Sequence, residues 1–309
     1  MNRPRCFAVC LVIALAVVSA DAGAATPLPG PGTAQQISKL VAVASRIEQL
    51  PRNLLPNLAQ ASADDVGTYY PATQFGCLST SSCQFGYLKS RSTIMLFGDS
   101  HAQMWLTALV PIANKYRLKL DLVWRPSCPA ATVTVWNVTA GSTYAACDVW
   151  RAAELRSIRR LKPSLVLLAS RNTDISGASN APIPDATWQS GLQRTIDSLR
   201  SPFTKVAVVG DITTFSAILP DCLAAYSSQI QRCSASDPNL KETNHFAAET
   251  AAAKATGVLY INPHPWLCTA VCSPVIGNMV AYYNDNHVSA TYAAFLSTVW
   301  LQALRAELP

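Results

Sequence analysis

The chain has 309 residues, of which 50% are hydrophobic and 14% are charged. A chain of this size and composition can bury a sizeable core, which excludes a largely disordered protein and favours one large domain, alone or with an appendage. The net charge of +6 comes without runs of Lys and Arg interleaved with aromatic residues, so we expect no nucleic-acid partner. This mild basicity is compatible with weak attraction to an anionic polymer.

The first 25 residues have the organisation of a secretory signal peptide. Arg3 and Arg5 precede an apolar run from Phe7 to Val18, and small residues follow from Ser19 to Ala25. The apolar run is shorter than the roughly 20 residues that span a bilayer, and no cysteine directly after it could carry a lipid. We therefore expect an exported protein that is periplasmic, secreted or associated with the cell envelope. A retained N-terminal anchor is the alternative.

The cysteines agree with export. Cys6 and Cys10 lie in the signal segment, which leaves eight, an even number that is typical of disulfide-bonded exported proteins. A zinc site is the alternative, but the sequence has no CxxC spacing and no Cys/His cluster with ligand spacing, so we expect no metal. The order of the eight cysteines along the chain suggests that neighbouring ones pair, although eight cysteines allow about 105 arrangements. The pairs we expect are Cys77 with Cys83, Cys128 with Cys147, Cys222 with Cys233 and Cys268 with Cys272.

Residues 26–90 are expected to be a linker, an amphipathic helix and a disulfide-stapled lead-in. The Pro- and Gly-rich stretch 26–33 predicts an extended linker. Apolar side chains at helical spacing predict a helix from Ala34 to Leu50, which ends before Pro51. The stretch 51–90 is rich in Pro, Ser, Thr and Gly and predicts irregular structure.

From residue 91 the sequence alternates between short apolar runs and helical segments, which is the pattern of β-α units that build a parallel sheet. We therefore predict that residues 91–309 form a three-layer α/β/α sandwich with a five-stranded parallel sheet, flavodoxin-like in its organisation. The predicted strands are Thr93 to Phe97, Leu118 to Trp124, Ser164 to Ala169, Lys205 to Val209 and Val258 to Ile261. The predicted helices are Ala102 to Tyr116 (disturbed at Pro111), Asp148 to Leu161, Asp185 to Leu199, Lys241 to Thr256 and Ser289 to Leu308.

Ligands of open parallel sheets bind outside the carboxyl ends of the strands, so the residues after each strand are the first candidates for a site. Ser100 follows the first strand and precedes a helix, where backbone N–H groups are free. A serine that transfers acyl groups needs a base and an oxyanion donor; Gly98 would allow a sharp turn, and the N–H of Ser100 would be one donor. The alternative is that Asp99 or Ser100 only caps the helix. The post-strand segments are Gly98 to His101, Arg125 to Cys128, Ser170 to Asp174, Gly210 to Thr213 and Asn262 to His264.

The base has to be one of four histidines. His101 follows the serine directly and starts the predicted helix, so its ring should point away from the hydroxyl. His245 lies in a polar helix start, and His264 lies between two prolines. His287 is the best candidate, because its loop also carries Asp285 and leads into the C-terminal helix, which would deliver an imidazole together with an orienting carboxylate. A capping or surface histidine is the alternative reading.

The segment LFGDSHAQMW resembles the first motif of the SGNH hydrolase superfamily, and in particular the extracytoplasmic SGNH domains that are fused to bacterial membrane acyltransferase-three proteins. The resemblance covers roughly residues 50–308 as an ordered series: LPRNLLPNLAQA, CQFG, SCPA, CDVWRAAELRSIRRLKPSLVLLAS, WLC, CSPVIGN and HVSATYAAFL. It implies an α/β/α fold, a serine that carries the acyl group and a histidine base near the C-terminus. Such domains move or remove O-acyl groups, usually acetyl, on envelope polysaccharides.

Carried over by position, the resemblance assigns Ser100 as nucleophile and oxyanion donor and His287 as general base. Asn172 falls where the oxyanion asparagine of the family lies, although Ser-Arg-Asn-Thr lacks the usual Gly-x-Asn-Asp, and an ordinary polar loop residue is the alternative. No glycine donor is identifiable. The family places its aspartate three residues before the histidine, where this chain has Asn284; the carboxylate of Asp285 lies two before. Either Asp285 orients His287, or a neutral group does, or the protein only binds.

We therefore expect an extracytoplasmic serine O-acyltransferase or acylesterase that acts through an acyl-serine and needs no cofactor. Its partners would be a carbohydrate or acyl-ester substrate and, for transfer, a separate membrane acyltransferase. One alternative is a catalytically impaired polysaccharide-binding module, whose aromatic residues would stack on sugars; the other is a lipase or thioesterase on the same scaffold. The aromatic candidates, for which core packing is the alternative, are Trp124, Trp136, Tyr144 and Trp150.

Overall fold

The computed structural model describes residues 27–71, 83–172, 175–236 and 245–309. The predicted signal peptide and Cys77 lie outside these residues. Within the described ranges no helix combines the length and the apolar character that a membrane span requires.

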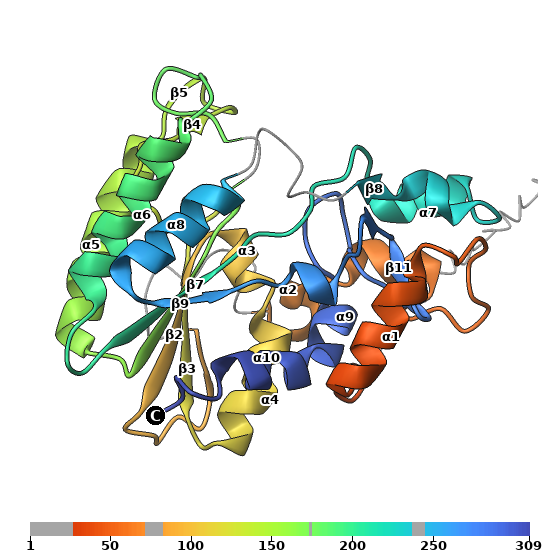
Figure 1. The fold of residues 1–309 in the computed structure, drawn as a ribbon, viewed down its shortest axis with the longest axis horizontal. Helices are drawn as coiled ribbons and strands as arrows, with labels where there is room; N and C mark the ends of the chain where they lie inside the picture. Colours follow the sequence, from red (N-terminus) through yellow and green to blue (C-terminus); the bar gives the residue numbers. More distant parts are fainter. Residues whose placement is uncertain (1–26, 72–82, 173–174, 237–244) are drawn as a thin grey trace, which may run out of the picture.

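The core of the molecule is a six-stranded sheet in the order β1-β3-β2-β6-β7-β9 (Figure 1). Its five parallel strands confirm the predicted set to within one residue at each end. The sixth strand is an antiparallel edge strand, β1, which comes from the lead-in that the sequence predicted to be irregular. The strands are β1 (Gln84–Gly86), β2 (Thr93–Gly98), β3 (Lys119–Trp124), β6 (Leu165–Ala169), β7 (Lys205–Val209) and β9 (Leu259–Ile261).

Strand β2 shows why these segments are apolar at every position. Ile94 and Leu96 point into one hydrophobic cluster, whereas Met95 and Phe97 point into a second cluster on the opposite face. All four side chains are buried. A strand covered on both faces cannot alternate polar with apolar residues, and this is the signature of a parallel sheet in an α/β sandwich.

Two helical layers cover the sheet, as predicted (Figure 1). One face carries α5 (Ala145–Leu161), α6 (Asp185–Leu199) and α8 (Phe246–Thr256). The other face carries α3 (Ser100–Gln103), α4 (Leu106–Lys115), α9 (Ala290–Phe295) and α10 (Ser297–Leu304).

The helices of the second layer are more divided than predicted. The segment 102–116 forms the end of α3 and then α4, with the break at Met104 and Trp105. Trp105 packs edge-on against Trp300 of α10, with ring centroids 5.1 Å apart, so tertiary packing fixes the break. Pro111 lies inside α4 without ending it. The helix is therefore interrupted before Pro111, at Met104 and Trp105, and not at the proline as predicted.

A group of short elements packs beside the sandwich. Those within residues 58–63, 219–233 and 275–280 surround a third apolar cluster made of Ala61, Leu223, Ile230, Val275 and Val280, whereas others bury side chains such as Ile37 and Val66 in the same cluster as Ile94 and Leu96. These elements were not predicted, apart from the first helix, which ends earlier than expected. They are α1 (Ala34–Ala44), η1 (Leu58–Ala63), α2 (Val66–Tyr69), α7 (Leu219–Ala225), η3 (Ile230–Cys233), β8 (Ala235–Ser236), η5 (His264–Trp266), β10 (Val271–Cys272), β11 (Val275–Ile276) and β12 (Met279–Val280).

Disulfides join three of the four expected cysteine pairs: Cys128–Cys147, Cys222–Cys233 and Cys268–Cys272. The fourth expected pair involves Cys77, which lies outside the described residues. The Cys128–Cys147 bond closes a loop that carries a small hairpin of β4 (Trp136–Asn137) and β5 (Ser142–Thr143).

Candidate active site

Ser100 lies at the carboxyl end of the central strand β2, as the sequence predicts. The strand ends at Gly98, where an added Cβ would lie only 1.7 Å from the carbonyl oxygen of Ala169 in β6. Glycine is therefore required for the close approach of the two strands. Asp99 then caps α3, because its carboxylate accepts the N–H of His101 at 2.9 Å. This turn makes Ser100 the first residue of the helix, where its own helix offers its N–H no acceptor.

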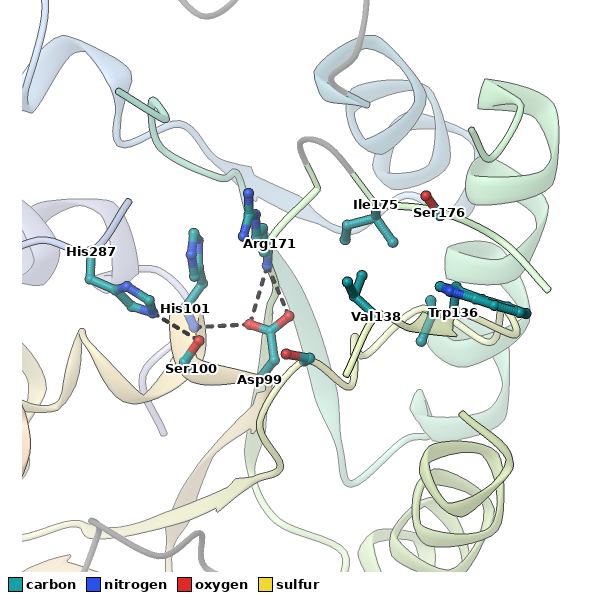
Figure 2. A pocket seen from close by; sticks show the side chains of 11 residues that line it. Asp99, Ser100, His101, Trp136, Val138, Arg171, Ile175, Ser176 and His287 are labelled. Carbon is teal, nitrogen blue, oxygen red and sulfur yellow. Dashed lines mark hydrogen bonds between the residues drawn. The ribbon is translucent and has the colours of Figure 1, made fainter. Parts of the chain in front are cut away.

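His287 meets Ser100 from the loop that precedes α9. Its Nε2 lies 2.8 Å from the hydroxyl oxygen of Ser100, and Figure 2 shows the imidazole pointing at that hydroxyl. The two residues are 187 positions apart in the chain. Ser289 begins α9 directly after the loop, and its hydroxyl oxygen caps the helix by accepting the N–H of Tyr292. The structure thus brings together the two residues that the sequence singled out for nucleophile and base.

The partner of the second imidazole nitrogen is Asn284. Its Oδ1 accepts the backbone N–H groups of Asn286 and His287 at 3.0 and 2.9 Å, which fixes which end of the amide faces the loop. Oδ1 and Nδ2 of Asn284 both lie 3.1 Å from Nδ1 of His287; Oδ1 is the atom that can accept a hydrogen from this nitrogen. If Nε2 is to accept the Ser100 hydroxyl proton, Nδ1 carries the hydrogen and donates it to this oxygen.

Asp285, the orienting carboxylate expected from the sequence, makes no hydrogen bond to His287 in the described part of the chain. The turn formed by Asn284 brings the amide three positions before the histidine against the ring. Asp285 instead holds the loop through its backbone carbonyl, which accepts the N–H of Phe215 at 2.7 Å. The geometry corresponds to the alternative in which a neutral group orients the base.

A cavity of about 240 Å³ opens over Ser100. On the side away from His287 it is walled by side chains of the β4-β5 hairpin and of the segment after β6 (Figure 2). Of the aromatic residues considered for sugar stacking, Trp136 lines this cavity, whereas Trp124 and Trp150 are buried in the core. The residues on the far wall are Val135, Trp136, Val138, Ile175 and Ser176.

Asn172, the expected oxyanion asparagine, is fully buried and does not line the cavity. Its backbone N–H donates to the carboxylate of Asp211 at 2.8 Å. The preceding residue, Arg171, lines the cavity in its place, and its backbone N–H donates to Asp99. The geometry therefore gives Asn172 no direct access to a substrate bound at Ser100.

Three further residues near Ser100 lie in the segments that follow the predicted strands, but the sequence provided no reason to assign them a role. Arg171 and Ser127 line the cavity, and Asp211 hydrogen-bonds Nδ1 of His101 behind it. Ser127 has a positive φ of 54°, a backbone conformation that glycine adopts most easily. Their positions at strand ends were the only sequence signal for them.

Burial and nearby charge set the protonation of the site. Burial lowers the pKa of His287, and the positive charges of His101 and Arg171 lower it further, to well below the usual range. Burial raises the pKa of Asp99 to about 6, although His101 opposes this shift. Because a base must be unprotonated to accept a proton, His287 is ready to act at neutral pH.

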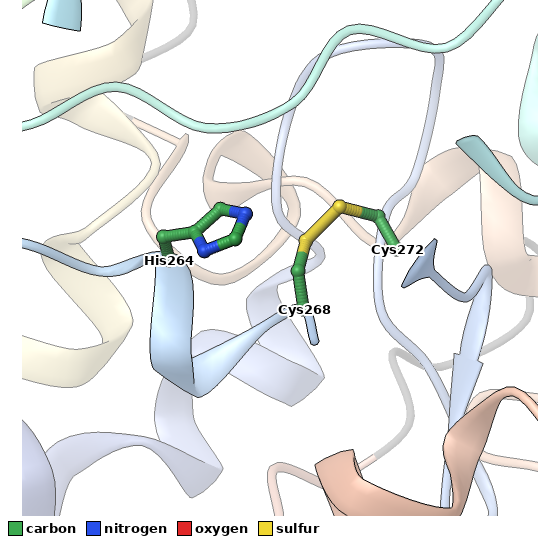
Figure 3. Close-up of side chains that lie close together, drawn as sticks. All are labelled: His264, Cys268 and Cys272. Carbon is green, nitrogen blue, oxygen red and sulfur yellow. A yellow bond between two sulfur atoms is a disulfide. The ribbon is translucent and has the colours of Figure 1, made fainter. Parts of the chain in front are cut away.

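The only potential metal-ligand cluster among the described residues is not available as a thiolate site. Ligand atoms of His264, Cys268 and Cys272 lie within 4.8 Å of one another, and all three residues are buried. However, the two sulfur atoms are joined in a disulfide, beside which the ring of His264 lies (Figure 3). Thiolates, rather than disulfide sulfur atoms, bind zinc.

Comparison with known proteins supports the resemblance seen in the sequence. Residues 67–302 match the family described as SGNH domain (fused to AT3 domains). The periplasmic domain of a lipopolysaccharide acetyltransferase from Salmonella ser. Paratyphi A superposes with a TM-score of 0.53 at 18% identity, covering 80% of this chain and 98% of that chain. A GDSL-like lipase from Bacteroides thetaiotaomicron gives a TM-score of 0.38 at 12% identity, covering 71% of this chain and 91% of that chain. No curated protein matches the sequence. Because the family match spans most of the chain, the chain belongs to the family of SGNH domains that are fused to AT3 domains, and it is an SGNH-type esterase or acyltransferase.

Proposed function

We propose that this SGNH domain moves or removes O-acyl groups, acetyl above all, on a carbohydrate of the cell envelope, with Ser100 as nucleophile and His287 as general base. The observation that carries the proposal is the 2.8 Å contact between Nε2 of His287 and the hydroxyl oxygen of Ser100 in an open cavity. A serine hydroxyl becomes a useful nucleophile only with a base at this distance.

The reaction has two halves. In the first, the oxygen of Ser100 attacks the carbonyl carbon of an acyl ester while Nε2 of His287 takes the hydroxyl proton; the ester bond then breaks, and the leaving alcohol receives that proton. In the second, a sugar hydroxyl or water gives a proton to Nε2 of His287 and attacks the acyl-serine; the bond to the Ser100 oxygen breaks, and His287 returns the proton to that oxygen. Asn284 accepts a hydrogen bond from Nδ1 throughout and so holds the ring and its tautomer.

The oxyanion that forms in each half needs hydrogen-bond donors. The N–H of Ser100 has no acceptor within its own helix. Because it belongs to the same residue as the nucleophile, it lies close to the carbonyl carbon that the hydroxyl attacks, so we assign it as one donor.

A location outside the cytoplasm is supported by three disulfides within the described residues, because such bonds persist in oxidising compartments. The structurally similar Salmonella domain is named as periplasmic and as part of a lipopolysaccharide acetyltransferase, which favours an envelope saccharide here. An acyl group for transfer would come from a membrane acyltransferase, the kind of domain to which members of this family are fused. Cell fractionation together with mass spectrometry of the N-terminus tests the location: a full-length cytoplasmic chain would contradict it.

The catalytic role of Ser100 is tested by hydrolysis of 4-nitrophenyl acetate. We expect Ser100→Ala to lower kcat by at least about 10³-fold, because loss of the nucleophile removes the acyl-enzyme route. Ser228→Ala, which removes an exposed hydroxyl outside the cavity, is the control and should retain activity. Equal rates for Ser100→Ala and the unaltered protein would rule out the acyl-serine mechanism.

The wall of the cavity opposite His287 is mostly apolar and could also contact a long acyl chain, so a lipase or thioesterase is the second candidate function. A series of 4-nitrophenyl esters from acetyl to decanoyl separates the two classes of acyl group. We expect the highest kcat/KM for the shortest chains, and a maximum at long chains would favour the lipase.

A further inference from the structure

Behind the Ser100–His287 pair lies a second histidine with its own carboxylate. His101 is buried, and its Nδ1 forms a hydrogen bond with Oδ1 of Asp211. Asp211 is buried as well and follows strand β7; its other oxygen accepts the backbone N–H of Asn172 at 2.8 Å. This histidine and aspartate have the relation that the base and its orienting carboxylate have in a serine triad, although it is His287 that contacts the serine.

The ring of His101 packs against the base. The ring centroids of His101 and His287 are 4.7 Å apart, with an angle of 63° between the planes, an edge-to-face arrangement. Tyr283 stacks against His287 as well, with centroids 5.4 Å apart and an angle of 30°. The imidazole that serves Ser100 is therefore held by two aromatic neighbours in addition to its hydrogen bonds with Asn284.

Each element that surrounds His101 contributes a charged or titratable group. Asp99 lies in the turn after β2 and accepts the backbone N–H of His101, and Asp211 approaches from the end of β7. Arg171 comes from the end of β6, and His287 comes from the loop before α9. Glu249 of α8 lies farther back, near Asp211.

The two carboxylates outweigh the other influences on His101. Burial by itself lowers the pKa of His101, but the charge and hydrogen bond of Asp211, with the charge of Asp99, raise it above the usual value. The positive ring then repels a proton on His287, since like charges about 5 Å apart interact strongly in a partly buried site. A cation at the face of a neutral aromatic ring is attractive, whereas two cations there would repel.

We propose that His101 is a positioning residue for the reaction: as an imidazolium bound to Asp211, it packs against His287 and keeps that ring unprotonated and directed at Ser100 in mildly acidic solution. The inference rests on the proposed function, in which His287 is the base. It also assigns a role to the histidine of the Gly-Asp-Ser-His segment, which the reaction itself does not use. The same charge opposes the imidazolium that forms on His287 during acyl transfer, so the arrangement extends the working pH range at some cost in maximal rate.

The test is the protonation midpoint of His287, measured by nuclear magnetic resonance of ¹⁵N-labelled histidine side chains, together with the pH profile of kcat/KM for 4-nitrophenyl acetate. His101→Gln removes the cation and leaves the Asp211 charge unpaired, so we expect the midpoint and the acidic limb to rise by at least about one pH unit. Asp211→Asn leaves His101 without the carboxylate that keeps it charged, and we expect a smaller rise. His245→Gln, which removes a histidine that pairs with Asp185 elsewhere, should change neither.

The combined variant, His101→Gln with Asp211→Asn, removes both charges of the pair and so leaves no unpaired charge at either position, which guards against a single variant that fails to fold. An unchanged His287 midpoint in this variant and in the folded single variants would overturn the inference, even if all of them turn over more slowly. The resonance measurement does not depend on turnover. A shifted midpoint in a protein that fails to hydrolyse any ester would contradict the proposed function and leave the role of His101 in the protonation of His287 intact.

Discussion

Asn284 occupies the position where the resemblance predicts an aspartate, and the change limits what His287 can do. A carboxylate beside Nδ1 would stabilise the imidazolium that forms during acyl transfer, whereas an amide oxygen only orients the ring. Together with burial and the positive neighbours, this leaves the pKa of His287 well below its usual range. In the proposed reaction, His287 would therefore be available as a base over a wide pH range, but it would be a weak one.

Restoring the carboxylate should therefore strengthen the base. We expect Asn284→Asp to raise kcat/KM by at least about tenfold near neutral pH, because the orienting aspartate can contribute up to about 10⁴-fold in serine triads. The acidic limb of the pH profile should move to higher pH, since a negative charge favours protonated His287. Asp285→Asn, one position along, is the matched control, and less than a twofold change is expected. A folded Asn284→Asp protein with unchanged or lower activity would show that the amide is needed for another reason.

At this scale the sequence predicted Ser100 and His287 because each has a distinctive context: a serine after a buried strand and a histidine at the start of the last helical segment. It did not distinguish Asp285 from Asn284. The difference depends on which side chain turns back to accept the N–H of His287, a matter of loop dihedral angles that residue spacing does not specify. Asp211 was one of several polar residues at strand ends, and only the fold shows that it lies against His101.

Among the elements, the five parallel strands were predictable because burial on both faces leaves an uninterrupted apolar run. The two-residue strands of the β4-β5 hairpin were not, because so short a segment has no detectable period. Yet this hairpin supplies Trp136 to the cavity wall, and Val138 follows directly after β4. The Cys128–Cys147 disulfide closes the loop that carries it, so the wall opposite the base depends on a covalent link as well as on packing.

We expect the double change Cys128→Ser and Cys147→Ser to lower kcat/KM for 4-nitrophenyl acetate at least about fivefold, mainly through KM, because the substrate-facing hairpin loses its tether. The control removes Cys222–Cys233, which closes a shorter loop away from the cavity, with a sequence separation of 11 against 19. Each removal should cost about 3 kcal/mol of stability. Kinetics measured below both unfolding temperatures separate the two effects, and an equal loss of activity in both double variants would contradict a specific role for the hairpin.

Across the whole molecule, several carboxyl groups are buried away from strong positive partners. Asp64 is an example that joins distant parts of the chain. Its backbone carbonyl accepts the N–H of Ala290 at 2.8 Å and its carboxylate accepts that of Thr291 at 3.2 Å, both at the start of α9, and the hydroxyl of Tyr69 donates to it as well. Burial nevertheless raises the pKa of Asp64 to about 6. The contact between the lead-in and the sandwich therefore includes a carboxyl group, that of Asp64, whose protonated form is favoured by burial.

This preference predicts a pH-dependent stability. A carboxyl group whose pKa rises from 3.8 to about 6 on folding binds its proton more tightly in the folded state. Its contribution is complete below about pH 4 and is lost as the pH rises through about 6. For Asp64 the loss between about pH 4 and pH 7.5 should be about 2 kcal/mol. Asp64→Asn keeps a hydrogen-bond acceptor without the charge, so it should remove this part of the slope and stabilise the protein most at the higher pH. Urea unfolding at the two pH values measures the difference, with Asp197→Asn as the control, because Asp197 forms only an exposed pair with Arg200. If Asp64→Asn changes the free energy of unfolding equally at both pH values, the pKa of Asp64 is the same in the folded and unfolded states, and burial at the contact between the lead-in and α9 does not raise it.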